Sequence, residues 1–111
     1  MDNAKLESLR REYQAQSLTP DQVHQDPCCQ FQQWLEQALA VACEDATAMV
    51  LSTVDESLCP DSRVVLLKGI EDGAFIFYGH FKSKKAMQIQ QNNAVALNFY
   101  WAACCRQVRI R

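Results

Sequence analysis

Two short stretches in the second half of the chain carry the residues best suited to bind a ligand. An apolar run within the sequence SRVVLLK is bounded by Arg63 and Lys68, and further on Ser83 is followed directly by Lys84 and Lys85. A serine that caps a helix leaves backbone N–H groups and the positive end of the helix dipole exposed. Two ammonium groups beside them add to the attraction for an anion. Together the two stretches predict a seat for a phosphate group.

Each stretch also has a plainer interpretation. Side chains alternate between the two faces of a strand, so the two cations of the first stretch are expected on opposite faces. The first face would carry Arg63, Val65 and Leu67, and the second Val64, Leu66 and Lys68. Charges at strand ends also oppose edge-to-edge aggregation, and lysines near a helix start are often solvated. Neither stretch alone is therefore specific for a ligand.

The charge distribution favours an anionic partner for the second half of the chain. Residues 1–61 hold eleven acidic and three basic residues, whereas residues 62–111 hold eight basic and two acidic residues. Such asymmetry is typical of a surface that meets an anion. The basic residues alternate with apolar strand residues instead of covering one polar face, so we expect a small phosphorylated ligand and no nucleic acid.

The sequence lacks the motifs of side-chain catalysis and of metal binding. It contains no GxGxxG or P-loop motif and no recognisable Ser-His-Asp or paired-carboxylate pattern. The six cysteines match no zinc spacing, so we expect reduced thiols, a cytoplasmic location and no metal. No apolar run reaches the length of a membrane helix. A phosphate seat without acid or base groups indicates that a cofactor carries the reactive chemistry.

The elements that position these residues are mainly strands with flanking helices, an α+β class. Apolar runs between turn residues predict five strands, at 48–54, 62–70, 74–78, 94–101 and 106–111. Helical periodicity and capping predict three helices, at 4–16, from Asp26-Pro27 onward, and from Ser83 to about Asn92 with Met87 and Ile89 as its apolar contacts. We expect residues 1–25 to form a mobile helix and connector, and residues 26–111 to form one domain.

The chain resembles the pyridoxamine 5′-phosphate oxidase family. The resemblance rests on the order and spacing of several stretches along the whole chain. They are Leu9-Arg10-Arg11-Glu12-Tyr13, Asp45-Ala46-Thr47-Ala48-Met49-Val50, Ser62-Arg63-Val64-Val65-Leu66-Leu67-Lys68-Gly69, Phe75-Ile76-Phe77-Tyr78, Ser83-Lys84-Lys85, Phe99-Tyr100-Trp101 and Arg106-Gln107-Val108-Arg109-Ile110.

This resemblance implies an FMN-binding split β-barrel that forms a homodimer with each FMN held between two subunits. The cofactor-binding positions that match the family pattern are Arg63, Val64, Val65, Leu66, Leu67, Lys68, Tyr78, Gly79, Ser83, Lys84, Lys85 and Gln107. Among these, the resemblance implies that Arg63, Lys84 and Lys85 hold the FMN phosphate. The substrate-binding positions are Arg10, Arg11, Glu12, Tyr13 and Lys68. No catalytic side chain is assigned.

The implied reaction is the oxidation of pyridoxamine or pyridoxine 5′-phosphate to pyridoxal 5′-phosphate, with molecular oxygen as the acceptor. The chain departs from the family pattern at Gly79, where Thr or Ser is usual, at Lys84, where Arg is usual, and in the turn Ala102–Cys105. Members of the family continue for about as much chain again, so we expect a barrel truncated after about the fifth strand. A non-catalytic flavin- or phosphate-binding fragment, or an interaction module, is the alternative.

Overall fold

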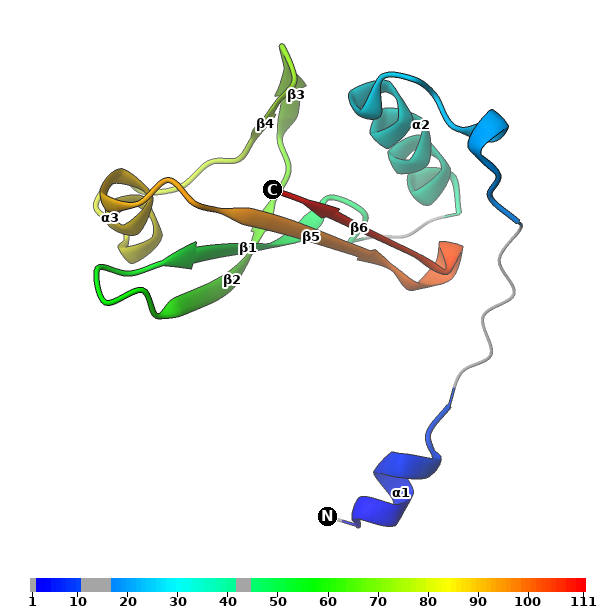
Figure 1. The fold of residues 1–111 in the computed structure, drawn as a ribbon, viewed down its shortest axis with the longest axis horizontal. Coiled ribbons are helices and arrows are strands. Elements are labelled where there is room, and N and C mark those ends of the chain that lie inside the picture. The colour runs from blue at the N-terminus through cyan, green and yellow to red at the C-terminus, as the bar shows by residue number, and fades with distance from the viewer. Residues whose placement is uncertain (1, 11–16, 42–44) are drawn as a thin grey trace.

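An antiparallel four-stranded sheet in the order β2-β1-β5-β6 forms the centre of the computed structural model (Figure 1). The structure describes residues 2–10, 17–41 and 45–111. Its helices are α1 (Asn3–Ser8), α2 (Pro27–Ala40) and α3 (Lys84–Gln91), with short 3₁₀ turns at Pro20–Gln22 and Ala102–Cys104. Its strands are β1 (Ala48–Val54), β2 (Pro60–Leu66), β3 (Gly69–Glu71), β4 (Ala74–Ile76), β5 (Ala96–Trp101) and β6 (Arg106–Ile110).

The predicted hairpin of the first two strands is confirmed. β1 and β2 pair antiparallel from Ala48 opposite Leu66 to Val54 opposite Pro60. Asp55 orders the intervening turn, because its side chain accepts hydrogen bonds from the backbone N–H groups of Ser57 at 2.8 Å and Cys59 at 2.9 Å. Such Asx turns are a common way to satisfy backbone donors in a loop.

The prediction of one continuous strand over residues 62–70 is wrong. β2 ends at Leu66, and the backbone then changes partner: Leu67 donates to the Thr47 carbonyl at 2.8 Å, but Lys68 donates to the Ile76 carbonyl at 2.7 Å. β3 and β4 consequently form a separate two-stranded sheet, closed by a tight turn at Asp72 and Gly73. Both turn residues have positive φ, as such two-residue hairpin loops require.

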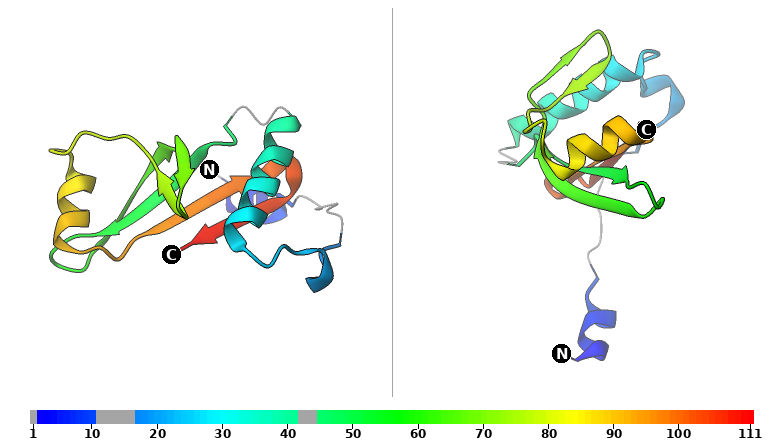
Figure 2. Two further views of the ribbon diagram at one scale, coloured as in Figure 1. Left: turned by 90° about the horizontal axis from the view of Figure 1, so that it is seen from above. Right: turned by 90° about the vertical axis from the view of Figure 1, so that its left-hand side faces the viewer.

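Helix α2 covers one face of the sheet near β6 (Figures 1 and 2). Its predicted start is confirmed, since the Asp26 side chain accepts from the N–H of Cys28 at 2.9 Å and Pro27 is the first helical residue. The buried Phe31 ring lies 4.9 Å from the rings of both Phe75 and Phe99. α2 therefore joins the small sheet and the large sheet in one core.

Trp101 closes this core at the end of β5. Its side chain is fully buried, and its indole N–H donates to the backbone carbonyl of Ala46 at 2.8 Å. A buried indole with a satisfied donor combines a large apolar contact with a fixed orientation. Phe99 and Trp101 lie on the same face of β5, so alternation places Asn98 and Tyr100 on the opposite face, which we call the outer face.

The N-terminal helix is shorter than predicted. α1 ends at Ser8, and Leu9 already has an extended backbone with φ −71° and ψ 104°. None of the residues of α1 is buried, so no tertiary packing supports a longer helix. Arg10 is exposed beyond this helix, and the predicted substrate residues Arg11, Glu12 and Tyr13 lie outside the described residues.

Candidate functional site

The guanidinium of Arg63 is held at four points between the β1–β2 hairpin and α3. Nη1 donates to the Leu51 carbonyl at 3.1 Å and to Thr53 Oγ1 at 2.8 Å, and both acceptors lie on β1. Nη2 donates to Gln88 Oε1 at 3.2 Å and lies 3.3 Å from Asp61 Oδ2. Arg63 is thus a fixed cation on the inner face of β2, as strand alternation predicts, and not a loose edge charge.

Asp61 connects this cation with the beginning of α3. Its Oδ2 lies 3.9 Å from Lys84 Nζ and accepts a hydrogen bond from Gln88 Nε2 at 3.3 Å. The bond from Gln88, the backbone N–H of Ser62 and the charges of Arg63 and Lys84 together lower the pKa of the Asp61 carboxyl below its ordinary value of 3.8. Asp61 is therefore an anion at neutral pH, placed between two cations.

Gln88 is the buried centre of this arrangement, and the sequence interpretation missed it. Only 4% of its surface is exposed, and its Oε1 also accepts from Thr53 Oγ1 at 2.5 Å.

The apolar contacts of α3 differ in part from those expected. The prediction of an apolar contact at Met87 is wrong, since that side chain is half exposed, whereas Ile89 packs against the core.

The spacing of the residues contains the signal for this network. Lys84 and Gln88 are four residues apart on one helix and so share a face. Asp61 and Arg63 are two residues apart on one strand and also share a face.

Ser83, Lys85 and Gly79 meet at a second position, around the first turn of α3. Ser83 caps the helix as predicted, and its Oγ accepts from the N–H of Ala86 at 3.3 Å. Together with Phe77, His80, Ala86, Ile89 and Gln90, these three residues line a hollow of about 290 Å³. The amides of the first turn have no carbonyl of their own helix to bond. The hollow therefore combines backbone donors with a hydroxyl and an ammonium group, a donor set that fits a phosphate.

Gly79 allows the close approach of Lys85 within this hollow. A Cβ atom added at Gly79 would lie 2.9 Å from Lys85 Cε and 3.3 Å from Nζ. The resemblance implies a residue with a hydroxyl group at this position. In this chain only backbone atoms of the loop face the lysine there. Any residue with a Cβ atom at this position would require the end of the Lys85 side chain to shift.

The remaining predicted residues of the second strand divide between the two faces. The side chains of Val65 and Leu67 are buried in the core, so any ligand along this strand would meet their backbone. Val64, Leu66 and Lys68 are exposed on the opposite side. Within the described residues β2 pairs on one side with β1, which leaves the other edge of its backbone open. Tyr78 is also exposed, in the loop before Gly79.

Gln107 lies apart from these residues in the described chain. It is on β6, and β1 and β5 separate that strand from β2 in the sheet. Its Nε2 donates to Asn98 Oδ1 at 2.9 Å across the β5–β6 pair, on the outer face of the sheet. The chain therefore gathers the predicted residues of β2 and α3 but keeps Gln107 on a distant strand.

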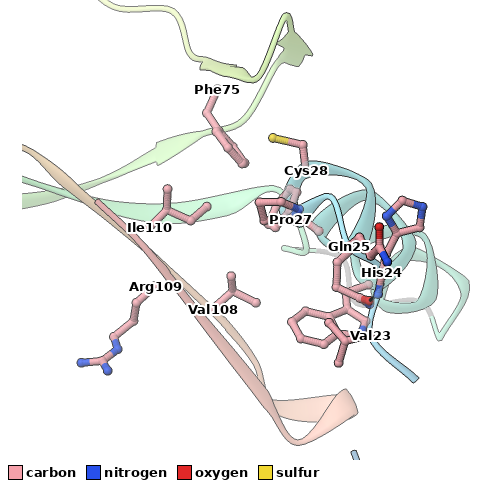
Figure 3. Close-up of a pocket in the computed structure, with 12 residues that line it drawn as sticks. Val23, His24, Gln25, Pro27, Cys28, Phe75, Val108, Arg109 and Ile110 are labelled. Carbon is pink, nitrogen blue, oxygen red and sulfur yellow. Dashed lines mark hydrogen bonds between the residues drawn. The ribbon is translucent and has the colours of Figure 1, made fainter. Parts of the chain in front are cut away.

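Another pocket, of about 390 Å³, lies between the beginning of α2 and the edge strand β6 (Figure 3). Phe75, Val108 and Ile110 line one side, and Pro27 and Cys28 line the other (Figure 3). None of the predicted site residues that the structure describes lines this pocket. Its lining is largely apolar, so it does not have the chemistry of a phosphate site.

The part of the chain that the structure describes contains five cysteines, and all five are free thiols. Within it, no group of three or more His, Cys, Asp and Glu side chains is arranged to hold a metal ion. In the same residues no helix is both long and apolar enough to cross a membrane.

Comparison with known proteins identifies the family. Residues 35–111 match the family model described as pyridoxamine 5′-phosphate oxidase. The chain belongs to this family. It is 54% identical over 106 residues to pyridoxine/pyridoxamine 5′-phosphate oxidase of Legionella pneumophila (strain Lens), covering 96% of this chain and 49% of that protein. It is 49% identical over 105 residues to the protein of the same name from Cytophaga hutchinsonii, covering 95% of this chain and 49% of that protein.

Two solved structures have a similar fold. PhzG from Burkholderia lata 383, in complex with tetrahydrophenazine-1-carboxylic acid, matches with a TM-score of 0.79 and 24% identity over 86% of this chain and 48% of that chain. A pyridoxamine 5′-phosphate oxidase-related, FMN binding protein from Nostoc punctiforme PCC 73102 matches with a TM-score of 0.64 and 23% identity over 85% of this chain and 46% of that one.

These matches confirm the predicted family and the predicted split-barrel fold class, with mostly antiparallel strands and flanking helices. The chain spans about half the length of the curated relatives it matches.

Proposed function

We propose that this chain forms the phosphate-binding half of an FMN site in a pyridoxamine 5′-phosphate oxidase. The observation that carries the proposal is the set of donors around the start of α3: Ser83 and Lys85 line a hollow there, and Lys84 and Arg63 both lie within 4 Å of Asp61 Oδ2 beside it. Family membership supports FMN as the ligand, and the Nostoc neighbour is described as binding FMN. A phosphate ester carries the charge and the acceptor oxygens that such a donor set recognises.

The residues of the seat have separate tasks in this proposal. Lys85 and the first-turn amides of α3 bind the phosphate oxygens, and Ser83 holds the helix start in place through its bond to the N–H of Ala86. Lys84, with 83% of its side chain exposed, adds charge at the rim. The open edge of β2 offers backbone donors and acceptors to the flavin ring. FMN held in this way would supply the hydride acceptor, and molecular oxygen would be the final electron acceptor, yielding hydrogen peroxide.

The substrate side of the proposal follows from the family and from the sequence. The names of the relatives point to pyridoxamine or pyridoxine 5′-phosphate as the substrate and pyridoxal 5′-phosphate as the product. Lys68 is the substrate-binding residue proposed within the sheet, together with the segment Arg10–Tyr13. Two further parts of the proposal are predictions from the sequence. The first is a homodimer with FMN between its subunits, and the second is a cytoplasmic location.

A second candidate function is flavin binding without turnover. The described residues form the proposed phosphate seat, and the chain spans about half the length of the curated relatives it matches. Both candidates require the phosphate seat, but the oxidase requires a substrate pocket as well. Turnover therefore separates the two candidates, and flavin binding alone does not.

Purified protein incubated with FMN and pyridoxine 5′-phosphate under air tests the proposal. The oxidase predicts formation of pyridoxal 5′-phosphate with an equal amount of hydrogen peroxide, and neither product when FMN is left out. Tight FMN binding without either product would support the non-catalytic candidate. A folded protein that takes up no FMN would overturn both.

A further inference from the structure

The proposed phosphate seat already contains a negative charge that belongs to the chain. Asp61 Oδ2 lies 3.3 Å from Arg63 Nη2 and 3.9 Å from Lys84 Nζ. We propose that Asp61 is an internal competitor for the ligand phosphate, and that its carboxylate weakens the preference of the chain for a phosphorylated flavin over an unphosphorylated one. This inference rests on the proposed function, because it assigns the same cations to the FMN phosphate.

The hydrogen bonds of Arg63 make the competition specific. Each of its two Nη nitrogens carries two hydrogens. Nη1 directs its two hydrogens to Leu51 O and Thr53 Oγ1, and Nη2 directs one to Gln88 Oε1. The carboxylate of Asp61 lies 3.3 Å from the same Nη2 as its ion-pair partner, so a phosphate oxygen that approaches Nη2 meets this carboxylate. Carboxylate and phosphate oxygens interact with the same N–H groups of a guanidinium in similar geometry. Asp61 is therefore the partner of Arg63 that a phosphate can replace by an equivalent interaction.

Asp61 is also the partner that is most easily displaced. Its side chain is 39% exposed, and that of Arg63 is 22% exposed. Ion pairs that are partly open to water are weaker than buried ones, so a phosphate separates this pair more readily than it breaks the contacts of Arg63 with β1. Leu51 and Thr53 hold the guanidinium from the strand side, so Arg63 keeps its position when the carboxylate swings away. The seat thus opens without rearrangement of the sheet.

Competition lowers the apparent affinity in a defined way. When a binding site is available for only a fraction of the time, the observed affinity is reduced by that fraction. The closed fraction is set by the attraction of Asp61 to Arg63 and Lys84. Only a ligand with an anionic group at this seat has to displace the carboxylate. Because riboflavin lacks the phosphate, its affinity does not depend on Asp61.

A structural role for Asp61 predicts the opposite sign. If the carboxylate served to orient Arg63 for the phosphate, its removal would lower the affinity for FMN. Asp61→Asn separates the two roles, because the amide keeps the size of the side chain and an oxygen that can accept from Gln88 and Arg63. Asp72→Asn is the matched control, because Asp72 lies in the β3–β4 turn with positive φ, a conformation that Asn tolerates.

The experiment is the titration of the unaltered chain, Asp61→Asn and Asp72→Asn with FMN and with riboflavin. We expect Asp61→Asn to bind FMN about 5-fold or more tightly than the unaltered chain does, which is the low end of usual coupling factors. Its affinity for riboflavin should change by less than about twofold. The affinity of the Asp72→Asn control for FMN should also change by less than about twofold. Unchanged or weaker FMN binding in Asp61→Asn, or an equal gain with riboflavin or in Asp72→Asn, would overturn it. If the unaltered chain does not prefer FMN to riboflavin, the proposed phosphate seat fails, and the inference fails with it.

Discussion

At the scale of single residues, the site is defined by how two basic side chains are held. Arg63 is fixed by four contacts to its own chain, whereas Lys85 lies over a bare glycine beside an open hollow. The first cation is oriented in advance, and the second is free to adapt to a ligand. This difference leads to two predictions, one for the loop glycine and one for the acid beside Arg63.

Gly79→Ala is expected to weaken FMN binding several-fold while leaving the fold intact. The new methyl group would lie 2.9 Å from Lys85 Cε, so the flexible lysine must move away from the hollow. Quenching of flavin fluorescence measures the affinity. Gly69→Ala serves as the control, because its added Cβ would meet Ile76 Cδ1 at an ordinary 3.8 Å. Equal affinity of the Gly79→Ala and unaltered chains would contradict the role given to Lys85.

The stability of the folded chain is expected to depend on the charge of Asp61. The pKa of its carboxyl is lowered in the folded chain, mainly by the hydrogen bond from Gln88. The carboxylate therefore contributes stability at pH values above its ordinary pKa of 3.8, and the contribution is lost as the pH falls through the lower folded pKa.

Thermal unfolding of Asp61→Asn and of the unaltered chain tests this dependence. We expect the variant to unfold at a lower temperature at pH 7, and the difference to shrink below about pH 3.8. A difference that stays constant down to pH 2.5 would rule out the proposed charge interaction. The same variant should lose stability and gain FMN affinity, a combination that a purely structural aspartate does not produce.

At the scale of elements, α2 and the aromatic side chains beneath it hold the two sheets together. Phe31→Ala is expected to cost about 3–5 kcal/mol of unfolding free energy, because a buried ring in contact with Phe75 and Phe99 is removed. Urea unfolding followed by circular dichroism measures this loss. Leu39→Ala, at an exposed position of the same helix, should change it by about 0.5 kcal/mol or less. Similar effects of both changes would show that α2 does not dock through Phe31.

The sequence predicted most elements because local signals determine them. The Asp26-Pro27 helix start, the hairpin of β1 and β2, and the Ser83 cap of α3 were all found from capping and turn residues. The division of the predicted strand at Leu67 was not found, because both halves are apolar and the backbone changes partner through tertiary pairing. Gln88 was missed for a related reason: a glutamine on a helix is normally solvated, and only the fold brings Thr53, Asp61 and Arg63 to it.

At the scale of the whole molecule, the outer face of the sheet carries exposed apolar side chains on β2. Val64 is 65% exposed and Leu66 is 46% exposed. Exposed apolar surface of this kind is common where a partner binds. The proposed homodimer places FMN between two subunits along this strand, so these side chains would lie close to the partner subunit.

Val64→Lys is therefore expected to convert the FMN-bound protein from dimer to monomer without unfolding it. Analytical ultracentrifugation with saturating FMN should show a species of twice the chain mass for the unaltered chain and of the chain mass for the variant. Leu39→Lys, on the exposed side of α2, should leave the dimer intact. The proposed interface would be contradicted if the unaltered chain were monomeric, or if Val64→Lys formed a dimer as completely as the unaltered chain does.

The central claim is that Arg63 and the first turn of α3 form a seat for the phosphate of FMN. Equilibrium binding of FMN and riboflavin to the same folded protein tests this claim most directly, because the two ligands differ only in that phosphate. FMN is expected to bind at least about tenfold more tightly than riboflavin, since charge-assisted hydrogen bonds contribute roughly 1.5–3 kcal/mol each. Equal affinities for the two flavins, or no binding of either, would contradict it.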